Sequence, residues 1–193
     1  MILSQPSALL PSLFEHIDEE RRLTVLHIGS ALPETVEFFS RYRCKLHFID
    51  LFSDLSELAS RDDSAAPLPG VFAELTRIPT GTQFDLCLFW DLFNFMRRDA
   101  IAALVDILRP HLHADSRAHG FAVHNTKAAQ SDKLYGIKAF DQISTRPRST
   151  RLPGYNPYNQ GQLERALDCF RVTRSVLLPD SRLELLLGAS LPT

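Results

Sequence analysis

The sequence has few of the features that mark several large classes of protein. Its three cysteines, Cys44, Cys87 and Cys169, are far apart and lie in apolar segments. An odd number without paired spacing argues against a disulfide framework or a zinc ribbon and predicts buried structural thiols. No apolar run approaches the roughly 18 residues of a membrane-spanning helix. A net charge of −2 gives no general reason to expect nucleic acid or an anionic membrane as a partner.

Several catalytic motifs are missing as well. The chain has no nucleophile elbow, no Ser-His-Asp arrangement and no glycine-rich phosphate loop, which disfavours hydrolases and nucleoside triphosphatases. Residues 1–22 lack the basic start of a signal peptide and turn acidic, so we expect a mature cytoplasmic protein. A chain of 193 residues is predicted to form one domain, residues 1–193, around one sizeable core.

The spacing of apolar residues predicts the order of elements. Residues 1–22 carry one apolar helical face and are expected to form an N-terminal helix. The rest of the chain predicts strands that alternate with helices, namely strands 23–28, 45–50, 84–90 and 120–124 and helices 33–42, 53–60, 71–78, 98–108 and 162–169. Two final strands flank a turn at 179–181. This order predicts an α/β fold, a mostly parallel sheet with helices on both faces and a C-terminal antiparallel β-hairpin.

Residues 126–160 show no clean periodicity and are expected to form a structureless substrate loop. The segment has a local excess of positive charge and nearby tyrosines, carried by Lys127, Lys133, Lys138, Arg146, Arg148, Arg151, Tyr135, Tyr155 and Tyr158. Such a loop could close over an anionic substrate. A solvated flexible loop is the alternative, and contact with RNA is the least favoured.

A strand, a turn and a distant acid form the most informative pattern. Strand 23–28 runs into Gly29 and a turn of small residues, and the next predicted strand ends on Asp50. In α/β folds such an arrangement holds the ribose of a nucleotide. Asp91 and Asn94 follow strand 84–90, and His124 closes strand 120–124, so all three are expected at the ligand-binding edge of the sheet.

With this pattern and the closing hairpin, the chain from about Leu23 to Ala189 resembles the class I S-adenosylmethionine-dependent methyltransferases, which have a Rossmann-like sheet. The family's first strand ends in D-x-G-x-G-x-G, and the matching residues here are His27, Gly29, Ala31 and Pro33. Only Gly29 agrees, since His27 replaces the acid and the second and third glycines are lost. The resemblance implies S-adenosylmethionine as cofactor, bound by His27, Gly29, Ser30, Ala31, Asp50, Leu51 and Asp91.

The same resemblance implies that Asp50 accepts hydrogen bonds from the ribose hydroxyls and that Asp91 and Asn94 lie near the transferred methyl group. For Asp50 the alternative is a solvated loop acid or an N-cap, and for Asp91 and Asn94 it is a cap of the following turn. His124 is a candidate general base, with a structural histidine as the favoured alternative. The remaining histidines between 111 and 119 are expected to face solvent, and no metal site is predicted.

These residues predict a methyltransferase that acts on an unknown acceptor, either a small molecule or a protein. A non-catalytic binding or regulatory module with the same fold is the alternative, because the cofactor turn has lost two glycines and its acid. A dinucleotide-binding oxidoreductase is the third and weakest hypothesis, since the chain lacks G-x-G-x-x-G. Nucleic acid and membrane are not expected as partners.

Overall fold

The central sheet has six strands in the order β3-β2-β4-β5-β9-β8. A computed structural model describes residues 2–15, 17–18, 20–61 and 67–191 of the chain. Four strands run parallel, β3 (Cys44–Ile49), β2 (Leu23–Ile28), β4 (Phe84–Trp90) and β5 (Leu112–Val123). The last two, β9 (Arg182–Ala189) and β8 (Phe170–Leu177), form the antiparallel hairpin expected at the C-terminal end.

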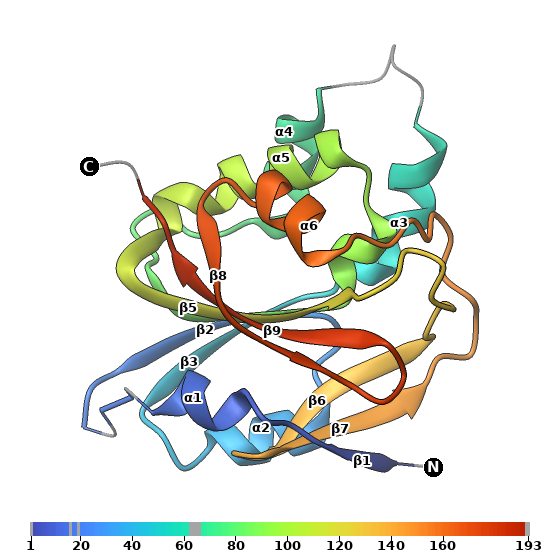
Figure 1. The fold of residues 1–193 in the computed structure, drawn as a ribbon. Helices are drawn as coiled ribbons and strands as arrows, with labels where there is room; N and C mark the ends of the chain where they lie inside the picture. Colours follow the sequence, from blue (N-terminus) through green and yellow to red (C-terminus); the bar gives the residue numbers. More distant parts are fainter. Residues whose placement is uncertain (1, 16, 19, 62–66, 192–193) are drawn as a thin grey trace.

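Helices cover both faces of this sheet, as predicted. Figure 1 shows α4, α5 and α6 on one face and α1 and α2 on the other. The helices are α1 (Leu10–Phe14), α2 (Pro33–Phe39), α3 (Leu51–Ser60), α4 (Leu68–Thr76), α5 (Arg98–Leu108) and α6 (Gln160–Ala166), with 3-10 turns at Leu92–Phe95 and Arg109–His111. Aromatic rings fill the core between the layers, with Phe38, Phe84 and Phe89 fully buried. Among the described residues, we find no helix with the length and apolarity needed to cross a membrane.

A second sheet was not predicted. The strands β1 (Leu3–Pro6), β7 (Gln142–Pro147) and β6 (Lys133–Ala139) pair antiparallel in the order β1-β7-β6. We call these three strands the cap sheet. The prediction of a structureless loop over 126–160 is therefore wrong. The predicted N-terminal helix over 1–22 is confirmed only for α1, since residues 3–6 form a strand and the described residues between Phe14 and Leu23 are not helical. Both faces of the hairpin carry buried residues, Tyr135 and Ile137 on one face and Gly136 and Ser144 on the other, so no period of two appears in the sequence.

The cap sheet docks closely on the first turn of α2. The backbone N–H of Ile137 donates to Thr35 Oγ1 at 3.0 Å, and the Arg146 guanidinium binds the Glu34 carboxylate at 2.6 Å. Between them lies Gly136, where an added Cβ would come within 2.7 Å of Thr35 Oγ1 and 2.8 Å of Ser144 Oγ. Only glycine permits this approach, so the cap is held against the start of α2, next to the predicted cofactor turn.

A buried polar cluster ties the N-terminal segment to the central sheet. The Glu184 carboxylate, on β9, is 0% exposed and lies 2.8 Å from His119 Nε2, which is also 0% exposed. The Ser7 hydroxyl donates to the same carboxylate, and the backbone N–H of Ala8 donates to its other oxygen at 3.2 Å. The prediction that His119 faces solvent is wrong, because β5 begins at Leu112 and carries this histidine into the core.

Candidate functional site

The carboxyl ends of β2, β3 and β4 bring together most of the residues predicted to bind a cofactor. Gly29 follows β2 with a φ of +124°, a conformation that favours glycine. Ser30 Oγ donates to Asp50 Oδ2 at 2.8 Å, which links the turn after β2 to the acid after β3. Asp91 follows β4, and the Arg148 guanidinium interacts electrostatically with both Asp91 and Asp50. The turn and the two carboxylates therefore surround one region.

Three buried aromatic rings pack against one another beside these strand ends. The Trp90 indole N–H donates to His27 Nε2 at 3.3 Å, and the Tyr135 ring stacks on Trp90 with centroids 5.5 Å apart and planes 13° apart. Trp90 has a φ of +54°, which is rare for a bulky residue and concentrates at functional sites. Burial lowers the pKa of His27 to about 4, so its imidazole is neutral at physiological pH. The histidine that replaces the family's acid thus contributes no charge.

Asp91 is only 4% exposed and belongs to a chain of hydrogen bonds that leads outward. The Tyr135 hydroxyl donates to Asp91 Oδ2 at 3.1 Å, and Arg182 Nη1 donates to the Tyr135 oxygen at 3.0 Å. Burial raises the pKa of Asp91 to about 7, against the opposing effects of Arg148, Tyr135 and Arg182. This carboxyl therefore changes charge near neutral pH.

Three buried polar atoms in the region have no hydrogen-bond partner among the described residues. They are His27 Nδ1, Asp50 Oδ1 and Asp91 Oδ1, one at each of the three strand ends. Buried side-chain polar atoms usually have a hydrogen-bond partner, so three such atoms without one in the same region require an explanation. Because Nε2 of the neutral His27 accepts a hydrogen bond, its Nδ1 carries the proton, and this N–H makes no hydrogen bond of good geometry although the ring lies near the backbone of Gly29 and Tyr135. The region offers one donor and two carboxylate acceptors to a ligand.

Other residues predicted at the site have different surroundings. Asn94 is buried, but its Nδ2 donates to the Phe121 carbonyl at 3.1 Å and its Oδ1 accepts from the Tyr158 N–H at 3.2 Å, contacts that favour the structural alternative. His124 is exposed at the end of β5. Leu51 is 0% exposed at the start of α3, whereas Ala31 is exposed in the turn after β2.

Comparisons with known proteins identify the fold. No family model and no curated protein matches the chain. Among solved structures, a Burkholderia thailandensis 1,6-didemethyltoxoflavin-N1-methyltransferase with bound S-adenosylhomocysteine is 14% identical, with a TM-score of 0.50 over 95% of this chain and 77% of that one. An S-adenosylmethionine-dependent methyltransferase from Clostridium acetobutylicum is 12% identical, with a TM-score of 0.50 over 86% of this chain and 84% of that one. The fold is that of the class I methyltransferases.

A further similar structure, of LepI in complex with S-adenosylmethionine, has a TM-score of 0.55 at 10% identity. This chain covers 46% of LepI, whereas the match includes 94% of this chain. Identities this low establish the methyltransferase fold alone and leave the activity of the present chain to be argued from its residues.

Three residues near the candidate site, Tyr135, Arg148 and Arg182, were not among the site residues predicted from the sequence. Tyr135 and Arg148 belong to the segment 126–160, which was singled out by its charge and tyrosines, although no individual residue could be chosen. Arg182 is the first residue of β9 and only 6% exposed. All three reach the strand ends through the cap sheet or the closing hairpin, so their positions depend on contacts between distant parts of the chain.

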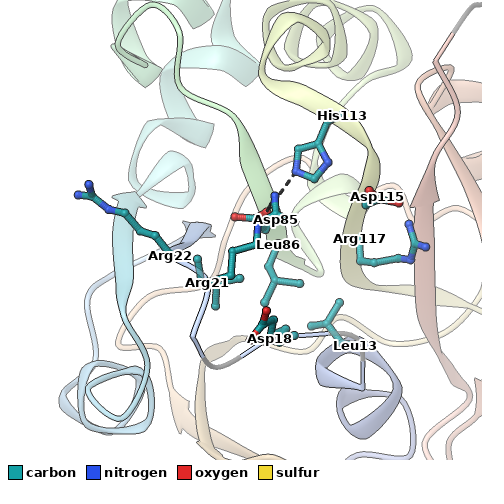
Figure 2. A pocket seen from close by; sticks show the side chains of 11 residues that line it. Leu13, Asp18, Arg21, Arg22, Asp85, Leu86, His113, Asp115 and Arg117 are labelled. Carbon is teal, nitrogen blue, oxygen red and sulfur yellow. Dashed lines mark hydrogen bonds and ion pairs between the residues drawn. The ribbon is translucent and has the colours of Figure 1, made fainter.

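A cavity of about 450 Å³ lies at the opposite edge of the sheet (Figure 2). It opens between the segment after α1 and the first residues of β2, β4 and β5. The Asp85 carboxylate in its wall binds Arg21 at 3.3 Å, His113 at 3.2 Å and the Thr24 N–H at 2.7 Å. No residue predicted to bind cofactor lines this cavity, and in the methyltransferase fold ligands bind at the carboxyl ends of the strands.

The raised pKa of Asp91 gives a test of its environment. An acid with a raised pKa contributes stability that is fully present below its unfolded value of 3.8 and is lost as the pH rises through about 7. The free energy of unfolding of the wild type should therefore fall between pH 4 and pH 7. We expect it to fall less in Asp91→Asn, as measured by urea denaturation at each pH. The exposed Asp99→Asn variant, also a carboxylate-to-amide change, is the control. A wild-type pH profile in Asp91→Asn would contradict the assignment.

Proposed function

We propose that this chain binds S-adenosylmethionine at the carboxyl ends of β2, β3 and β4 and transfers its methyl group to an acceptor. The observation that carries the proposal is the convergence of three unpaired buried polar atoms, on His27, Asp50 and Asp91, at the ligand edge of a methyltransferase fold. When bound, S-adenosylmethionine supplies an electrophilic methyl group on a sulfonium.

The residues present fit such a ligand. Asp50 has one oxygen fixed by Ser30 and the other free, so its carboxylate can accept from a ribose hydroxyl while its orientation is held. Gly29 turns the chain with positive φ at the end of β2, where a ligand must approach the backbone closely. The neutral His27 offers its Nδ1–H as a donor, in place of the acceptor that an acid would provide.

Asp91 is suited to take a proton from an acceptor. A general base works best when its pKa lies near the working pH, and burial raises the pKa of Asp91 to about 7. The hydrogen bond from Tyr135 fixes Oδ2 and leaves Oδ1 free. Since methyl transfer depends largely on positioning, this fixed carboxylate and the rigid walls of Trp90 and Tyr135 are the contribution expected of the protein.

The alternative is a non-catalytic binding module. The cap sheet supports it, because Tyr135 contacts Asp91 and the Arg148 guanidinium lies 4.3 Å from the Phe52 ring centroid, so both side chains lie beside the cofactor residues. The replacement of two glycines by Ala31 and Pro33 points the same way. One of the similar structures is a pericyclic reaction enzyme, and the fold alone therefore does not specify methyl transfer.

Calorimetric titration with S-adenosylmethionine and S-adenosylhomocysteine tests the proposal. We expect the wild type to bind both and Asp50→Asn to bind at least about tenfold more weakly, since it loses a charged acceptor. Glu57→Gln, a change of an exposed acid on α3, the helix that follows Asp50, should bind as the wild type does. Because Trp90 is the only tryptophan, its fluorescence should also change on binding. Absence of binding at millimolar ligand would refute the proposed function.

A further inference from the structure

A second cavity of about 510 Å³ opens at the same edge of the sheet as the proposed cofactor site. Its walls are the loop 129–133, the last residues of β7 and the turn between β8 and β9. We call it the cap pocket. Arg182 lines it and donates to Tyr135, which donates to Asp91. One tyrosine therefore separates the cap pocket from the buried carboxyl group.

Most of the charged residues in the cap pocket are already paired. The Arg146 guanidinium binds Glu34 at 2.6 Å, and Arg182 binds Asp180 at 2.8 Å. The Asp132 carboxylate accepts from Gln130 at 2.6 Å. Because each of these charged groups already has a protein partner, none of them needs a bound ion to balance its charge.

Lys133 differs from these residues. Its ammonium group has no hydrogen-bond or ion-pair partner among the described residues, although the side chain is half-buried. Burial lowers the pKa of Lys133, and Arg182 lowers it further, while Asp180 and Asp91 act in the opposite direction. An ammonium group that has lost part of its hydration without gaining a partner is a natural site for an anion.

A hydroxyl group and an apolar surface complete the cap pocket. The buried Ser131 oxygen has no hydrogen-bond partner in good geometry and lies near the Tyr135 phenol. Leu3, on β1, lines the mouth with 53% of its surface exposed, and Pro147 lines the wall. The pocket therefore combines an ammonium group that has no ion-pair partner among the described residues with a hydroxyl beside Tyr135 and an apolar surface.

We propose that the cap pocket binds a small organic carboxylate, with its carboxylate on Lys133 and Ser131 and its apolar body against Leu3 and Pro147. This ligand is distinct from the acceptor of the methyl group, because the buried Tyr135 lies between the cap pocket and Asp91. Its place beside Tyr135 puts the bound molecule next to the chain of hydrogen bonds that ends at Asp91.

Lysine NMR tests the proposal directly. The chain has only four lysines, Lys45, Lys127, Lys133 and Lys138, so ¹³C-labelled lysine gives few signals. Titration with benzoate, without S-adenosylmethionine, should shift the Lys133 signal in a saturable way and raise the pKa of Lys133. Benzamide has the same ring without the charge, and phosphate has the charge without the ring. Neither should reproduce the shift at the same concentration.

Variants identify the residues that bind benzoate. We expect Lys133→Met to weaken benzoate binding at least about tenfold and Ser131→Ala to weaken it severalfold. Lys138→Met, on the same strand but exposed, should leave binding unchanged. Circular dichroism confirms that each variant is folded. Equal binding of benzamide or phosphate, or benzoate binding that survives in a folded Lys133→Met variant, would overturn the proposal.

The experiments can refute the cap pocket proposal and the proposed function independently of each other. If S-adenosylmethionine binds and benzoate does not perturb Lys133, the cap pocket proposal is wrong and the proposed function stands. If benzoate binds at Lys133 and S-adenosylmethionine does not bind at all, the pocket stands as an anion site and the proposed function is wrong.

Discussion

Replacing Glu184 with alanine is expected to lower the free energy of unfolding by about 3–5 kcal/mol, because it removes one partner of a buried polar cluster. The carboxylate binds the buried His119 and Ser7 side chains and the partly buried Ala8 N–H. Without it, the two side chains stay buried and lose this hydrogen-bond partner. Urea denaturation measures the change, and Glu74→Ala, an exposed acid on α4, should alter stability by less than about 0.5 kcal/mol.

The same cluster has a defined pH dependence. Burial opposes ionisation of Glu184, but the hydrogen bond and charge interaction with His119 and the Ser7 hydroxyl outweigh it, so the pKa lies below its ordinary value of 4.5. A lowered acid pKa contributes stability that is present above 4.5 and is lost as the pH falls through the folded value. The difference in free energy of unfolding between the wild type and Glu184→Ala should therefore be smaller at acidic pH. A constant deficit at pH 3 and pH 7 would contradict this account.

Replacing Tyr135 with alanine is expected to cost about 3–5 kcal/mol of stability, the range for removal of a buried aromatic ring. The ring is 3% exposed and stacks on Trp90, and its hydroxyl joins Asp91 to Arg182. Tyr135→Phe keeps the stacked ring and loses only these hydrogen bonds, so we expect about 1–2 kcal/mol. Phe140→Ala, an aromatic 57% exposed in the turn of the cap sheet, is the control with little effect. Thermal and urea denaturation give the values.

Tyr135 also separates the two hypotheses on function. If it orients Asp91 within an enzyme site, Tyr135→Phe should bind S-adenosylmethionine no more tightly than the wild type does. If the cap sheet instead closes the site of a binding module, loss of the Tyr135 contact should raise the affinity. A clear rise in affinity for Tyr135→Phe would therefore favour the module over the methyltransferase.

The central sheet could be predicted from the sequence because its signals are local. The run 84–90 is apolar apart from Asp85, as expected for a strand covered on both faces, and the turn 179–181 separates two antiparallel strands. The meeting of Gly29, Asp50 and Asp91 follows from topology, since parallel strands present their carboxyl ends at one edge. The roles of these residues toward a cofactor remain predictions.

The cap sheet could not be predicted because its stability comes from distant partners. Ser144 and Arg146 look like loop residues in sequence and are held by Glu34, more than a hundred positions away. His119 looks like a surface histidine until Glu184 is placed beside it. In each case a polar side chain is paired with a distant partner that local periodicity cannot reveal.

The pairing of the cap sheet has a consequence for the order of folding. Ser7 and Glu184 are 177 positions apart, and β1 pairs with β7 across most of the chain. Contacts of such sequence separation form slowly, because the loop between them must close first. The parallel strands can therefore assemble before the cap closes over them. We expect the single tryptophan, which the cap buries, to acquire its native emission in a late kinetic phase, after most of the sheet's circular dichroism has appeared.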